Sequence, residues 1–296
     1  MVRSLVLRGA GAGAVAGLVA FVYALVVAEP LVSAAIDYEG AREEASDALR
    51  GIVPAEEGPD LVDRGVQSTL GIGVGLVALG IAFGVLLALA FALFLGRSGR
   101  LRPRALGLLL AAGGFVTLYA VPFLKYPANP PAVSADDTIG DRTGLYLIMV
   151  VASVAVAVLA AVLGRRLAAR AGTFTAALLA GGAFVVVMTA VGLLLPALGE
   201  LTANVVANGP RATETPGPLL DGSGSIAFPG FDPDLLYDFR LASVVTQGIL
   251  WAVLGAIFAP MAELVVAPPS TTPPGTPSST PSRSGASPAA DTAGVA

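Results

Sequence analysis

A short polar stretch, residues 121–147, concentrates side chains that could bind a cation through oxygen. The oxygen-bearing side chains are Asn129, Asp136, Asp137, Thr138 and Asp141. Carboxylate, hydroxyl and amide oxygens suit hard divalent cations such as Mg²⁺ or Ca²⁺ better than cobalt or nickel. Their spacing matches no EF-hand or other dedicated metal loop. The alternative role for Asp141 and Thr143 is to cap the next helix.

Further charged and amide side chains stand at the ends of the long apolar runs around this stretch. Together with two residues of the stretch itself they form a candidate cation-binding mouth. The candidate metal ligands are Glu29, Gln67, Asn129 and Asp137. The supporting charges, which would hold carboxylates by ion pairing, are Arg64, Lys125, Arg142 and Arg240. The alternative is interfacial anchoring, in which long side chains reach out of the bilayer into water.

The composition excludes several classes of chemistry. The chain has no cysteine and no histidine, so disulfides, thiolate nucleophiles and imidazole bases or metal ligands are ruled out. No P-loop, HExxH or GxSxG motif is present. No basic face supports nucleic-acid binding. We therefore expect neither an enzyme nor a protein with a permanently bound cofactor.

The elements that must position these residues are membrane helices. The chain is 55% hydrophobic and 13% charged, about half of the roughly 25% charged residues of soluble domains. At 1.5 Å per residue, each apolar run is long enough to cross a ~30 Å hydrocarbon core as a helix. The sequence thus predicts an all-α polytopic bundle over residues 1–266, with six transmembrane helices at about 9–28, 68–95, 105–124, 144–163, 173–195 and 241–259.

The charges predict which loops face which side. Arginines precede the first run and fill the second and fourth connections, residues 96–104 and 164–172, which indicates that these segments are cytoplasmic. The intervening outer segments, 29–67, 125–143 and 196–240, hold 19 of the 21 carboxylates. Both termini are therefore expected in the cytoplasm. A cleaved signal peptide remains the alternative for the first run, and it would leave the other five spans in place.

The polar segments have individual characters. Residues 38–51 are expected to form a short polar helix in the first outer loop. Residues 201–230 are rich in Gly, Pro, Asn and Thr and are expected to form a segment without regular secondary structure. The Pro/Ser/Thr-rich tail, residues 267–296, has no apolar period and is predicted to be disordered in the cytoplasm.

Glycines recur four residues apart in the first two predicted spans. They are Gly9, Gly13 and Gly17 in the first, and Gly71, Gly75, Gly80 and Gly84 in the second. Small residues at this spacing let helix backbones approach closely in lipid. We expect packing within the bundle, with an interface between copies of the chain as the alternative.

Several long strings resemble the CbtA family, the proposed cobalt transporter subunit of bacteria. The strings are residues 7–39, LVDRGVQSTLG (61–71), VPFLKYPANPPAV (121–133), DDTIGDRTGLYL (136–147) and FRLASVVTQGILW (239–251). The positions that match family motifs are Glu29, Pro30, Arg64, Gln67, Lys125, Pro127, Asn129, Pro130, Asp137, Thr138, Arg142, Arg240 and Gln247.

The resemblance implies a polytopic subunit of the bacterial plasma membrane that imports Co²⁺ for cobalamin synthesis. It also implies a partner, the small single-span, histidine-bearing subunit CbtB. Family members often carry histidines in the first outer loop, which this chain lacks.

Our hypothesis is a divalent-metal transporter subunit whose acidic outer vestibule concentrates the cation by electrostatic focusing. Two alternatives remain at this stage. One is a non-transporting membrane scaffold that docks a partner protein. The other is a transporter of another divalent cation such as magnesium, which the all-oxygen side chains would favour.

Overall fold

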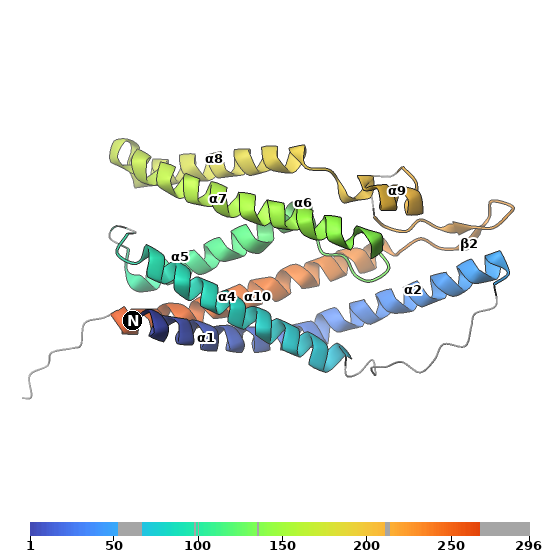
Figure 1. The fold of residues 1–296 in the computed structure, drawn as a ribbon, viewed down its shortest axis with the longest axis horizontal. Coiled ribbons are helices and arrows are strands. Elements are labelled where there is room, and N and C mark those ends of the chain that lie inside the picture. Colours follow the sequence, from blue (N-terminus) through green and yellow to red (C-terminus); the bar gives the residue numbers. More distant parts are fainter. Residues whose placement is uncertain (53–66, 98, 100, 135, 211–213, 267–296) are drawn as a thin grey trace, which may run out of the picture. The chain divides into compact units, whose positions relative to one another are not determined.

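The structure, a computed structural model, is built almost entirely from long helices (Figure 1). It describes residues 1–52, 67–97, 99, 101–134, 136–210 and 214–266, so the predicted disordered tail lies outside the described residues. Within that part, six helical segments are long and apolar enough to cross a membrane: Val2–Arg50, Thr69–Phe94, Pro103–Lys125, Ile139–Ala171, Thr173–Glu200 and Pro233–Val266. The prediction of a helical bundle with six membrane spans is confirmed.

The first span continues far beyond its predicted end. Helix α1 (Val2–Tyr23) passes through a π-helical segment, η1 (Ala24–Ala28), directly into α2 (Glu29–Arg50). The prediction of a loop from residue 29 with a separate helix at 38–51 is therefore wrong for this part of the chain. Nothing between residues 29 and 50 breaks the helix, and it ends where Gly51 adopts the left-handed conformation, at φ 69°.

Two π-helical segments stand immediately before prolines inside continuous helices. Segment η1 precedes Pro30. Segment η3 (Phe115–Ala120) joins α5 (Pro103–Gly114) to α6 (Val121–Lys125), whose second residue is Pro122. Proline lacks the N–H of the normal helical bond and its ring crowds the carbonyl four residues earlier, so a wider turn before it lets the helix continue.

Helices α1 and α4 (Ile72–Phe94) meet backbone to backbone along their glycines. The close pairs are Gly9 with Gly84, Gly13 with Gly80 and Gly17 with Leu76. A Cβ atom on Gly13 would lie 2.0 Å from the carbonyl oxygen of Gly80, which is too close for any side chain. Only glycine at this position lets the two helices approach as they do. Gly71 and Gly75 have open space instead. The predicted packing role holds for the first three glycines and for Gly80 and Gly84.

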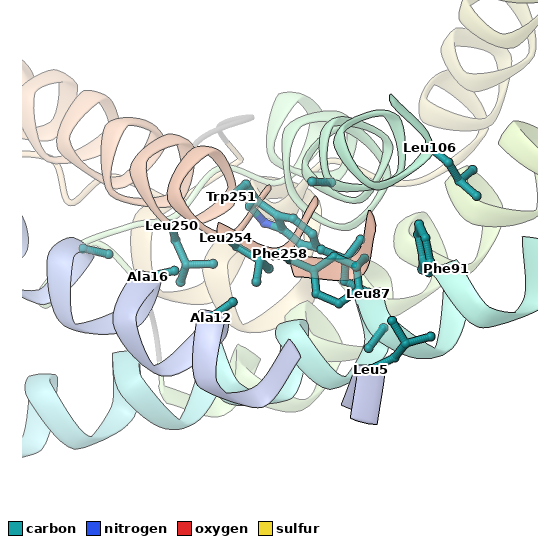
Figure 2. Close-up of a cluster of buried hydrophobic side chains, with 14 residues drawn as sticks. Leu5, Ala12, Ala16, Leu87, Phe91, Leu106, Leu250, Trp251, Leu254 and Phe258 are labelled. Carbon is teal, nitrogen blue, oxygen red and sulfur yellow. The ribbon is translucent and has the colours of Figure 1, made fainter. Parts of the chain in front are cut away.

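Helix α10 (Pro233–Val266) packs against both α1 and α5. On the α5 side, small residues alternate across the contact: a Cβ on Gly107 would lie 2.9 Å from that of Ala259, and one on Gly114 would overlap the ring of Trp251. On the α1 side, Leu250 and Leu254 are fully buried. Figure 2 shows these side chains gathered in one apolar cluster with residues of α1 and α4.

Helices α7 (Ile139–Ala171) and α8 (Thr173–Leu194) form an antiparallel pair (Figure 1). Helix α7 contacts the rest of the bundle at η3 and α6. The Tyr146 hydroxyl donates to the carbonyl oxygen of Leu118 at 3.1 Å, and the Ser153 hydroxyl donates to the carbonyl oxygen of Thr117. A π-helical turn leaves carbonyls outside the regular ladder, and in lipid they need such partners.

The segment between α8 and α10 is more ordered than predicted. Its elements are the 3₁₀ turn η5 (Leu198–Glu200), α9 (Thr202–Asn208) and an antiparallel pair of short strands, β1 (Leu219–Leu220) and β2 (Ile226–Phe228). Asp221 organises the hairpin turn, because its carboxylate accepts hydrogen bonds from the Ser223 hydroxyl and from the backbone N–H groups of Ser225 and Ser223. These bonds, above all the one from the hydroxyl, lower the pKa of Asp221. The expectation of an irregular segment is wrong over these elements.

Helix α2 provides the surface against which this hairpin region rests. The Tyr38 hydroxyl donates to the carbonyl oxygen of Pro229 at 3.1 Å, and its ring meets that of Phe231 edge to face. Arg42 donates to the carbonyl oxygen of Gly217 at 2.9 Å. The continuation of the first helix past residue 28 therefore holds the hairpin region, within the outer segment 196–240, against the bundle.

We predict that Gly13→Ala destabilises the protein by about 1–3 kcal/mol, because the new methyl group collides with the α4 backbone, which cannot move aside as a side chain could. Gly11→Ala is the matched control on the same helix, since its Cβ would meet nothing within 4 Å. The midpoint of thermal unfolding in detergent measures both. Equal midpoints for the two variants would contradict the backbone contact.

Candidate functional site

The candidate site forms around a carboxylate in the segment before α10. Glu214 is only 8% exposed. Its Oε2 accepts a hydrogen bond from the Asn129 amide at 2.5 Å, and its Oε1 lies 3.4 Å from Nε of Arg142 and 3.4 Å from the amide nitrogen of Asn204. A buried carboxylate needs such partners to remain charged.

Arg240 completes this arrangement, which we call the Glu214 network: Asn129, Arg142, Asn204, Glu214 and Arg240. The guanidinium of Arg240 donates to Oδ1 of Asn129 at 2.7 Å. Asn129 therefore joins the carboxylate of Glu214 to the arginine through its two amide atoms. The network links the ends of the spans α5–α6, α7 and α10 with α9.

The proline-rich loop after α6 sets the position of Asn129. Pro127 and Pro130 restrict the backbone on either side of it, and Ala132 adopts a left-handed conformation at φ 69°. The loop closes on Val133, which is fully buried against Phe231. These constraints fix the loop backbone so that the Asn129 side chain points at Glu214.

A cavity of about 480 Å³ adjoins the network and shares Arg142 with it. Three tyrosines, Tyr119, Tyr126 and Tyr146, are among the residues that line it. The Tyr126 hydroxyl donates to the carbonyl oxygen of Pro196 at 2.9 Å, and burial raises the pKa of this phenol. The cavity thus offers aromatic faces and one guanidinium, not a set of carboxylates.

The structure brings together only some of the predicted site residues. Asn129, Arg142 and Arg240 join the Glu214 network. Lys125 lies outside it, with its ammonium 5.7 Å from the centre of the Tyr126 ring. Asp137 is exposed, in the short turn η4 (Asp136–Thr138) before α7.

The remaining predicted residues lie elsewhere or beyond description. Glu29 is half-buried inside the continuous first helix, where its Oε1 accepts from the Ser33 hydroxyl at 3.4 Å. Gln67 opens the π-helical segment η2 (Gln67–Gly71), but its side chain is not described, and Arg64 falls outside the described residues. No group of three or more acidic side chains is placed to hold a metal within the described ranges.

The predicted capping role of Asp141 and Thr143 is wrong. Helix α7 starts earlier than expected, with Thr138 as its N-cap residue. Thr143 lies inside the helix, where its hydroxyl donates to the carbonyl oxygen of Ile139. Asp141 is in the first turn, where its charge favours the helix dipole without capping it.

Sequence reasoning missed Glu214 and Asn204. Glu214 is a single carboxylate in a segment rich in Gly, Pro and Thr, and no periodicity marks it as buried. Asn204 lies in α9, and its amide also donates to the carbonyl oxygen of Leu198 at 2.8 Å. One signal in the sequence could have pointed to Glu214. Two arginines, Arg142 and Arg240, lie near the starts of membrane helices, where a buried guanidinium needs an acidic partner.

Arginines mark the opposite ends of the helices. Arg165 donates to the backbone carbonyl of Arg97 at 2.7 Å, so the second and fourth connections lie together. Arg8 donates to the carbonyl oxygen of Met261 at 2.8 Å, which joins the start of α1 to the end of α10. We call the helix ends that carry Arg8, Arg97 and Arg165 the arginine end. We call the opposite helix ends, which carry the Glu214 network, the polar end.

We predict that Glu214→Gln and Arg142→Gln each lower the thermal unfolding midpoint, because each leaves a partly buried charge without its partner. The double variant should lose no more than the worse single one, since both remove the same interaction, with a coupling of about 1–3 kcal/mol. Glu44→Gln, at an exposed position on α2, is the neutral control. Additive losses would show that the two side chains act separately.

Comparison with known proteins agrees with this architecture. No curated protein and no solved structure matches the chain. The family model described as probable cobalt transporter subunit (CbtA) matches residues 2–263, which include the first five spans, the sixth span up to residue 263, and the whole Glu214 network. This multi-pass membrane protein therefore belongs to the CbtA family of probable cobalt transporter subunits.

Proposed function

We propose that the protein imports divalent cobalt through a mouth at the polar end. The observation that carries the proposal is the network around Glu214, in which Asn129 and Arg142 contact its carboxylate and Arg240 donates to Asn129, so that side chains at the ends of three spans meet, in a chain of the CbtA family. The arginine end, by the excess of basic residues in its connections, faces the cytoplasm together with both termini, and the polar end faces outward.

The proposed ligands are the predicted set, Glu29, Gln67, Asn129 and Asp137, extended by Glu214. In the structure both oxygens of Glu214 and Oδ1 of Asn129 are engaged by N–H donors. A cation arriving at the mouth would exchange with these donors, above all with the guanidinium of Arg240. Arg142, Arg240 and Lys125 would then keep the ligands in place while the site is empty.

The membrane potential supplies a driving force for import. Moving one charge across the bilayer is worth about 2.3 kcal/mol per 100 mV, so a divalent cation gains about 4.6 kcal/mol per 100 mV, inside negative. The proposed import is therefore downhill without an energy-consuming step on this chain.

A partner helix has a place to bind. An apolar groove of about 600 Å³ runs between α5, α7 and α8 and is lined mainly by alanine and glycine, including Gly113, Ala161 and Gly181. Small side chains allow a second helix to approach closely in lipid. We propose that the small single-span, CbtB-like subunit implied by the family resemblance places its membrane helix here and contributes the imidazole ligands that this chain lacks.

Radioactive cobalt uptake tests the proposal in cells without their own system. The chain is expressed alone, with the small partner subunit, and not at all, and uptake is expected only with both. Replacing Glu29 and Asp137 together by alanine is expected to reduce this uptake at least about tenfold, because two of the proposed oxygen ligands are lost. Unchanged uptake in that variant would make the ligand assignment wrong.

Two adjacent glycines provide matched variants for the partner in the same experiment. Gly181 lines the groove and Gly182 does not, and a Cβ on either meets nothing within 4 Å. Gly181→Leu should abolish partner-dependent uptake and Gly182→Leu should preserve it. No uptake in any combination would favour the scaffold alternative, and uptake of magnesium in place of cobalt would favour the other cation.

A further inference from the structure

The cavity of about 480 Å³ beside the Glu214 network extends from the headgroup level of the membrane into its hydrocarbon. Arg142, which lines the cavity, lies two residues before the apolar run of α7, and Lys125 of the neighbouring helix α6 directly follows the apolar run of its own span. Both cations therefore lie where headgroups meet hydrocarbon. Leu147 and Tyr119 also line the cavity, and at 1.5 Å per residue they lie about 8 Å and about 9 Å deeper along their helices.

The cavity opens along the side of α7. Ile139 and Leu147 line it, yet their side chains are 59% and 54% exposed. A side chain that both lines a cavity and is largely exposed lies at its opening. Ile139 precedes Arg142 and Leu147 lies inside the apolar run, so the opening faces headgroups at one end and acyl chains at the other.

The charge at the cavity favours an anion. No carboxylate is among the described residues that line it. Glu214 faces only Nε of Arg142, at 3.4 Å, and neither Nη group of this guanidinium bonds to any residue in the described part of the chain. The Arg142 side chain is 25% exposed, so a ligand in the cavity can reach it. Lys125, whose ammonium lies 5.7 Å from the centre of the Tyr126 ring, adds a second positive charge beside the cavity.

We propose that this cavity binds an anionic phospholipid of the outer leaflet. The lipid phosphate accepts hydrogen bonds from the Nη groups of Arg142, because a planar guanidinium matches the spacing of phosphate oxygens. The ammonium of Lys125 attracts the same charge, and an acyl chain leaves the cavity along Leu147. A soluble anion such as inorganic phosphate could use Arg142 but would leave the apolar part of the cavity unfilled, so the shape favours a lipid.

This inference goes beyond the proposed function and does not depend on it. Lipid binding is measured on the purified chain without cobalt, so a failed uptake experiment leaves it standing. The lipid phosphate and the carboxylate of Glu214 share one guanidinium, which places the lipid in direct contact with the Glu214 network.

Two adjacent leucine-sized residues on α7 provide the main test. Leu147 lines the cavity and Ile148 does not, although their side chains are 54% and 51% exposed. Native mass spectrometry of the full chain in detergent gives the dissociation constant of added phosphatidylglycerol. Leu147→Trp fills the opening and Arg142→Gln removes the phosphate donor, so each is expected to weaken binding at least about tenfold. Ile148→Trp is expected to bind as the unchanged chain does.

Equal dissociation constants for the unchanged chain, Leu147→Trp and Arg142→Gln would overturn the inference, because the lipid would then bind elsewhere on the surface. If Arg142→Gln fails to accumulate in the membrane, Lys125→Gln replaces it, since Lys125 lies outside the Glu214 network, and weaker binding is again expected.

Two further ligands distinguish an anionic lipid from other sources of phosphate. Phosphatidylcholine is expected to bind at least about tenfold more weakly than phosphatidylglycerol, because its choline balances the phosphate charge that the cations attract. Equal binding of the two lipids would contradict recognition of an anionic lipid. Inorganic phosphate is expected to leave phosphatidylglycerol bound, and displacement by an equal concentration of it would instead indicate a site for a soluble anion.

Discussion

The architecture depends on the rule that every backbone polar group in lipid must find a partner within the protein. Helices satisfy the rule along their length, and this chain meets it even where prolines would break a helix. The π-helical segments before Pro30 and Pro122 keep the spans continuous. Where the second of them releases carbonyls, Tyr146 and Ser153 of α7 donate to them. The same bonds attach the α7–α8 pair to the rest of the bundle.

Helix α10 connects the bundle's packing to its polar chemistry. Its side toward α5 is apolar and fits against glycines, as in the contacts of Ala259 with Gly107 and of Trp251 with Gly114. Its first turns carry Arg240 into the Glu214 network. One helix thus contributes both to the apolar core and to the Glu214 network.

Some features could be predicted from the sequence because they follow from local rules. Long apolar runs specify spans by length alone, and the spacing of Gly9, Gly13 and Gly17 specifies a close helix contact without naming its partner. The arginines of the second and fourth connections indicated a shared end, and the contact between Arg165 and Arg97 confirms that these connections lie together.

Other features depend on contacts between distant residues and carry no local signal. Glu214 is buried because Asn129, 85 residues earlier, points at it, and no pattern around either residue predicts that pairing. The helix past residue 28 was mistaken for a loop because acidic composition suggested solvent. It does face solvent in part, yet Tyr38 and Arg42 bind the hairpin region and keep it ordered. The predicted ligands Glu29 and Asp137 stay predictions.

The most direct measurement of the central claim is cobalt entry into liposomes that contain the purified chain and its small partner subunit, under an imposed membrane potential. Our account predicts entry that speeds up as the interior is made more negative, since each divalent ion gains about 4.6 kcal/mol per 100 mV. Entry no faster than into empty liposomes, at every potential, would contradict it.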